Sequence, residues 1–94
     1  MAQLFESGRV RTAAQATRAL RDNLEERAMG PGRRAFRESE PLKGAAAEAM
    51  RERLQGLERE YGRIIGELSS ISAELNRYAA ALEEVGERLT REML

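Results

Sequence analysis

Apolar side chains recur at alternating steps of three and four residues through the second half of this 94-residue chain. The steps run without a slip over the five heptads from Leu54 to Leu89, a pattern typical of a helix that buries one seam against other helices. It predicts a single helix over residues 45–92, about 70 Å long at about 1.5 Å per residue. The seam residues are Met50, Leu54, Leu57, Tyr61, Ile64, Leu68, Ile71, Leu75, Tyr78, Leu82, Val85 and Leu89.

The width of this seam indicates how the helix pairs. Small or apolar residues also follow four of the seam residues from Ile64 onward, at Ile65, Ser72, Ala79 and Gly86, where a two-stranded coil would place charges. Such a stripe favours a four-helix bundle over a lone coiled-coil dimer, although both remain open. We expect a protein interface, with a second copy or with another helical hairpin, formed by Leu54, Leu57, Tyr61, Ile64, Leu68, Ile71, Leu75, Tyr78 and Leu82.

A shorter apolar stripe predicts a first helix over residues 8–29. Ser7 is expected to cap its start, which leaves Leu4 and Phe5 to fold back onto the first turn. The stripe consists of Val10, Ala13, Thr17, Leu20 and Leu24, with Ala14 and Ala28 beside it.

Glycine and proline predict where the chain reverses. Gly30, Pro31 and Gly32 are expected to end the first helix, and Pro41 disfavours helical geometry at the residue before it. We therefore place the break and turn at residues 30–44. The expected fold is all-α, a single helical-hairpin domain over residues 1–94.

Composition argues against catalysis. The chain has no cysteine and no histidine, so it lacks disulfides, thiolate metal ligands and the commonest general base. We expect no enzyme activity, no cofactor and no metal site. Glu48 with Glu52, and Glu83 with Glu87, are one helical turn apart, but are better explained as solvent-facing acids. Likewise Ser69, Ser70 and Ser72 have no base to activate them, and serine within a helix often bonds to the carbonyl four residues back.

Charge and hydropathy limit the partners. Sixteen basic and sixteen acidic residues cancel, so no net field attracts nucleic acid or an anionic membrane. Arg33, Arg34 and Arg37 with Phe36 form the one small patch that suits nucleic acid, and we rank it below protein binding. No apolar run is long enough to span a bilayer, and the start lacks a signal-peptide core. We expect synthesis in the cytoplasm and, if the protein is secreted, export without a cleaved signal peptide.

The middle of the chain resembles a known family. Leu42, Lys43 and Gly44, followed by AAAEAMRERLQGL, resemble the WXG family of small type VII secretion substrates and the related LXG pattern. The W-x-G turn of that family joins two helices. The resemblance implies a substrate or partner protein that works as a folded pair, recognised by a secretion ATPase or bound to a toxin. In the turn, Leu42 would pack over the reversal and Gly44 would let the backbone pass closely.

One element of the family pattern is missing. The export signal places an acid four residues after a tyrosine, whereas Tyr78 is followed at that spacing by Leu82 and only then by Glu83. Either a companion chain supplies the signal or the protein is not exported. The alternative function is therefore a cytosolic coiled-coil adaptor or chaperone that binds a partner protein.

The seam is testable at its centre. Leu68→Asp would place a charge among apolar side chains, which is costly unless the charge is paired. We expect this variant to dissociate the pair and to lose helicity, as measured by light scattering and circular dichroism. An unchanged mass and melting curve would show that the heptad register is wrong.

Overall fold

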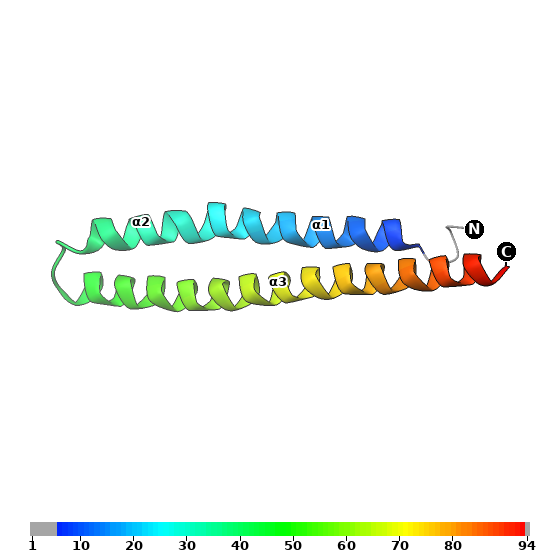
Figure 1. Ribbon diagram of the computed structural model, residues 1–94. Helices are drawn as coiled ribbons and strands as arrows, with labels where there is room; N and C mark the ends of the chain where they lie inside the picture. Colours follow the sequence, from blue (N-terminus) through cyan, green and yellow to red (C-terminus); the bar gives the residue numbers. More distant parts are fainter. Residues whose placement is uncertain (1–5, 94) are drawn as a thin grey trace. The chain divides into compact units, whose positions relative to one another are not determined.

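The protein is all-α over residues 6–93, the part of the chain that the computed structural model describes. Helix α1 (Ser7–Leu24) leads into a π-helical turn η2 (Glu25–Met29), and helix α2 (Gly30–Ser39) follows directly (Figure 1). The long helix α3 (Ala45–Met93) completes the chain. Among the described residues there is no strand, which confirms the predicted fold class.

The chain forms two compact units, which we describe separately. Unit 1 combines residues 6–19 of the first helix with residues 68–93 of α3, and unit 2 comprises residues 20–67. Within each unit the earlier and later segments are antiparallel helices. The expectation of a single domain stays a prediction.

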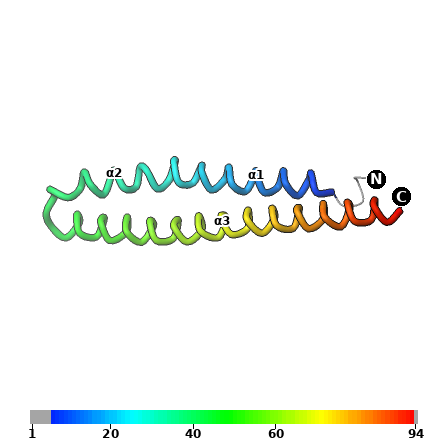
Figure 2. The backbone as a smooth tube through the Cα atoms, viewed as in Figure 1, coloured from blue at the N-terminus to red at the C-terminus, as the bar shows by residue number. Residues whose placement is uncertain are grey.

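Unit 2 is a helical hairpin whose reversal lies within the predicted range (Figure 2). Helix α2 ends at Ser39 and α3 begins at Ala45, so only five residues connect them. Gly44 has φ 108°, a conformation that a residue with a Cβ adopts only with strain. Helix α3 begins at Ala45, the predicted residue, and ends at Met93, one residue beyond the expectation.

The predicted break at Gly30, Pro31 and Gly32 is wrong, because the backbone stays helical to Ser39. The reason lies in the π-helical turn that precedes it. The Gly30 N–H donates to the Glu25 carbonyl, five residues back instead of four. The backbone hydrogen bonds have therefore already left the α-helical pattern before Pro31, which has no N–H to donate. An α-helix interior penalises proline for its clash with the carbonyl four residues back, and a π-turn is one way for a helix to continue past it.

The start of the first helix also differs from the prediction. Ser7 is already helical, and the Glu6 carbonyl accepts hydrogen bonds from the backbone N–H groups of Arg9 and Val10, at 3.1 and 3.2 Å. Leu4 and Phe5 lie outside the described residues. Ser7 is therefore not the N-cap.

The buried face of the first helix is rotated relative to the predicted stripe. Val10, Thr17 and Leu24 are half-buried as expected, but Ala13 and Leu20 are exposed. Ala14, one residue after Ala13, is buried instead. The face centred on Ala14 allows closer backbone approach than one centred on Leu20, because alanine leaves room for the neighbouring helix.

Two glycine substitutions separate a turn requirement from helix propensity. We expect Gly44→Ala to destabilise the protein by about 1–2 kcal/mol, because alanine is strained at this positive φ. Gly62→Ala is the matched control, since a Cβ there meets no atom within 4 Å and alanine favours a helix by about 1 kcal/mol. Chemical denaturation measures both. Equal stability of Gly44→Ala and the parent protein would contradict the observed turn.

Candidate protein-interaction surface

Over the described part of unit 1, the three buried residues are all small. Ala14 and Ala79 are 1% and 0% exposed, and Ser72 is buried with them. The Ser72 hydroxyl donates a hydrogen bond of 3.0 Å to the carbonyl oxygen of Ala14, so a side chain of α3 reaches the backbone of α1 directly. Larger side chains at Ser72 or Ala79 would separate the two helices.

This contact corrects one expectation and explains another. Ser72 was expected to bond within its own helix, whereas it bonds to the neighbouring one. Ser72 and Ala79 belong to the small or apolar positions that widen the seam, and the remaining two, Ile65 and Gly86, are half-buried. The widened stripe was therefore the sequence signal for the packing inside the chain.

The predicted interface residues consequently fall into a half-buried group and an exposed group. Half-buried are Leu54, Leu57, Tyr61 and Ile64 in unit 2, and Leu68, Leu75 and Leu82 in unit 1. Ile71 and Tyr78 instead remain 46% and 57% exposed. In unit 1, α1 covers one side of the seam and leaves the other side open.

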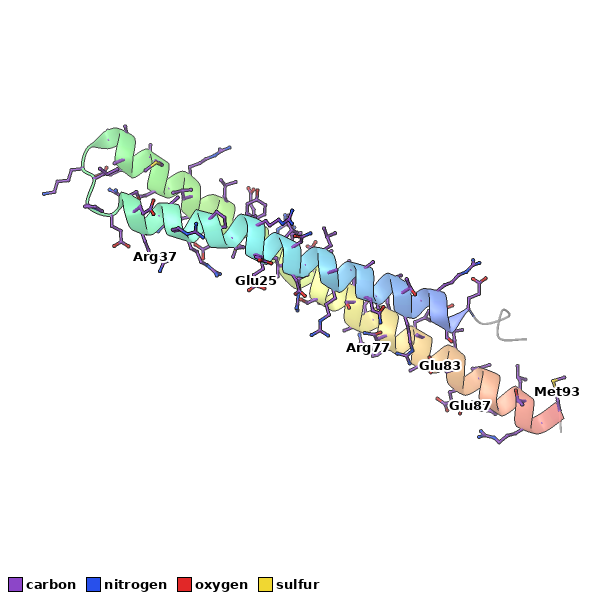
Figure 3. All side chains as sticks on the ribbon, turned by 90° about the horizontal axis from the view of Figure 1, so that it is seen from above. Glu25, Arg37, Arg77, Glu83, Glu87 and Met93 are labelled. Carbon is purple, nitrogen blue, oxygen red and sulfur yellow. The ribbon has the colours of Figure 1, made fainter. Side chains whose placement is uncertain are left out.

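The open side forms a row that we call the Tyr78 stripe, consisting of Ile71, Tyr78, Val85 and Leu89 of α3. All four side chains are exposed, and at 100° per residue they share one face of the helix. Met93 is exposed at the end of α3 (Figure 3). Singly exposed apolar residues are common, but a row at helical spacing marks a surface suited to a partner helix.

The flank of unit 1 opposite the stripe is polar. At about 100° per residue, Glu83 lies about 40° to one side of Ala79, and Tyr78 about 100° to the other. The Arg11 guanidinium donates to the Glu83 carboxylate at 2.6 Å, and both side chains are partly exposed. The hydrogen bond from Arg11 holds the pKa of Glu83 below its ordinary value, and the same bond raises the pKa of Arg11. This flank joins α1 to α3 while staying hydrated.

In unit 2 the turn motif is held by a residue that the sequence analysis missed. Arg51 Nη1 donates to the carbonyl oxygens of Ser39 and Leu42, at 2.8 and 3.0 Å. The Ser39 carbonyl also accepts from the Leu42 N–H at 3.0 Å, and Leu42 follows α2, so the guanidinium ties the end of α2 to the turn. Leu42 itself is 54% exposed, which corrects the expectation that its side chain packs over the turn. An arginine early in a helix gives no sequence signal for this role.

Beside the π-helical turn, unit 2 has an open groove of about 290 Å³. Met29, Leu54 and Tyr61 contribute apolar surface to it, and Arg33 donates to Glu58 at its edge, at 3.1 Å. The groove is an apolar recess next to a hydrated ion pair.

The same part of unit 2 contains the arginine patch considered above as a nucleic-acid site. Arg33 is engaged with Glu58, and Phe36 is half-buried, so two of its four side chains already have contacts within unit 2. Stacking on a base requires an open aromatic face. The patch is therefore not arranged as a free stacking platform.

Residues 6–93 offer neither a metal site nor a membrane span. No cluster of three or more acidic side chains there could hold a metal ion, and Glu83 of one predicted carboxylate pair is engaged with Arg11. No described helix combines the length and apolarity needed to cross a membrane. The surface features left over are apolar side chains and exposed ion pairs, which suit binding to protein.

Comparison with known proteins adds no identity. No protein-family model, no curated protein and no solved structure matches the chain significantly.

The close contact at Ser72 predicts opposite effects for two substitutions. Ser72→Leu would insert a large side chain where α1 approaches within hydrogen-bond distance, and we expect a loss of about 1–3 kcal/mol in the free energy of unfolding. Ser72→Ala removes one hydrogen bond but keeps the space, so its cost should stay near 1 kcal/mol. Urea denaturation followed by circular dichroism measures both variants. If leucine were tolerated as well as alanine, the helices would not approach this closely.

Proposed function

We propose that this protein is a small, non-enzymatic substrate or partner protein of a bacterial type VII secretion system, acting as a folded pair of helical hairpins. Its role is to present a helical surface to a companion hairpin, to a toxin or to the secretion ATPase. Export, in this proposal, needs no cleaved signal peptide.

The observation that carries the proposal is the turn. Leu42, Lys43 and Gly44 occupy the connection between α2 and α3, and the glycine has the positive φ that no other residue type adopts readily. The resemblance to the WXG and LXG patterns rests on the same three residues, so the motif and the reversal coincide. The exposed position of Leu42 leaves its side chain available to a partner.

The thin core supports a role in pairing. Among the described residues, no large side chain is fully buried, and the most buried apolar residues are Ala14, Met29 and Ala79. A chain of this size has little apolar surface to bury, and small domains often gain stability from a partner. A protein that is completed by binding fits a carrier or partner role better than catalysis.

The alternative is a cytosolic coiled-coil adaptor or chaperone. It is favoured by one specific feature, the lack of an acid four residues after Tyr78. An adaptor would use the same exposed side chains on a partner protein, without leaving the cell.

Export from the native host distinguishes the two functions. The tagged chain is produced in cells with and without the type VII ATPase, and its amount in the medium is compared by immunoblot with a cytoplasmic marker of lysis. We expect the chain in the medium only when the ATPase is present. We also expect Gly44→Ala to reduce export several-fold and Gly62→Ala to leave it unchanged, because only the former disturbs the turn.

An intact intracellular chain that never appears in the medium in either strain would overturn the secretion proposal and favour the adaptor. Export of Gly44→Ala at the parental level would remove the turn from the recognition step.

A further inference from the structure

We propose that the Tyr78 stripe is the contact between two copies of this chain, with the α3 helices antiparallel and Tyr78 at the two-fold axis. This inference rests on the proposed function, in which the protein acts as a folded pair, and names the second member of the pair. It also assigns the surface and the orientation of the contact.

The first argument is the position of the large apolar side chains in unit 1. The residues packed most closely between its two helices are Ala14, Ser72 and Ala79, which are small. The large apolar side chains of α3 are either half-buried, as at Leu68, Leu75 and Leu82, or exposed on the adjoining face, as at Ile71, Tyr78 and Val85. Covering the exposed ones would add the apolar burial that the internal contact lacks, which is the main favourable term in association.

The second argument is the symmetry of the stripe between Ile71 and Val85. Ile71 lies seven residues before Tyr78, and Val85 lies seven residues after it. When a second α3 runs in the opposite direction, Ile71 meets Val85 of the other copy at both ends, and Tyr78 meets Tyr78 in the middle. A two-fold contact requires such a self-complementary surface, in which each patch meets the same patch.

The third argument is the size of the side chains that meet. Helix α1 is about as long as the stripe, which extends over about 27 Å at about 1.5 Å per residue, but Leu20 is the one large apolar residue exposed on it. A second α3 therefore matches the row of large side chains in the stripe better than a second α1 does.

The orientation follows from including both helices of unit 1. A two-fold axis perpendicular to the helices places each α3 against the other and each α1 beside the other, as in a four-helix bundle with antiparallel neighbours. A parallel pairing of α3 helices along the stripe would send the two α1 segments to opposite sides. The antiparallel pair therefore buries more surface.

Electrostatics permits this self-association. Unit 1 has six arginines and six glutamates, and the whole chain is also neutral, so two copies do not repel each other through net charge. The ion pair of Arg11 with Glu83 lies on the opposite flank and keeps its water in the dimer. Glu74 lies one helical turn before Tyr78, about 40° around α3, so its exposed carboxylate borders the contact.

Cross-linking tests the geometry, because the chain has no cysteine of its own. Tyr78→Cys puts a single thiol at the proposed axis, and Ala80→Cys puts one on another exposed face of the same helix turn. With a short bis-maleimide reagent, we expect dimers from Tyr78→Cys and at least tenfold fewer from Ala80→Cys. In a mixture of Ile71→Cys and Val85→Cys we expect the mixed dimer to exceed either homodimer.

Light scattering across a dilution series tests the affinity. We expect the full chain to be a dimer, and Tyr78→Asp to raise its dissociation constant about a hundredfold, because a charge would be buried without a partner. Ala80→Asp introduces the same charge on another face and should leave the dimer intact. Circular dichroism should show both variants helical, since Tyr78 and Ala80 are exposed within the chain.

Three outcomes would overturn the inference. The first is a monomer at all concentrations, which would leave the stripe for a different protein. The second is a dimer whose Tyr78→Cys variant does not cross-link, which would place α3 against the other α1. The third is a preference of Ile71→Cys for homodimers, which would make the helices parallel. None of these three outcomes changes the result expected for export, so the proposed function and this inference can fail separately.

Discussion

The fold of unit 1 depends on the contact of small side chains between α1 and α3. Ser72 donates to the backbone of Ala14, and Ala79 is completely buried nearby, so the helices approach closely along these residues. This close contact determines which face of α3 packs against α1. Because the small residues face inward, the seam residues at Ile71 and Tyr78 turn outward. One packing choice therefore creates both the internal contact and the external surface.

Unit 2 depends on hydrogen bonds at two irregular places along its backbone. Arg51 donates to the carbonyl of Ser39, at the end of α2, and to that of Leu42, in the turn that follows. At the other place, the π-helical turn offsets the hydrogen-bond ladder before Pro31 and lets the helix continue to the reversal. The turn at Leu42 to Gly44, on which the proposed function rests, is positioned by both.

The functional conclusions share one physical basis, which is the small amount of apolar surface buried inside the chain. A neutral helical protein without histidine or cysteine has few chemical groups for catalysis, but it has exposed apolar side chains at regular spacing. Such side chains gain free energy when another helix covers them. Pairing with another helix is what the proposed secretion role and the proposed antiparallel dimer have in common.

The sequence by itself determined the all-α class, the start of α3 and the reversal before it, because these follow from local periodicity and from the backbone preferences of glycine and proline. It did not determine that the chain passes Gly30 to Gly32 as a helix, since the π-turn depends on hydrogen bonds along the backbone. Only the tertiary structure decided which side of the seam faces inward. Periodicity identifies an apolar stripe, whereas the side that packs depends on how closely Ser72 and Ala79 let the neighbouring helix approach.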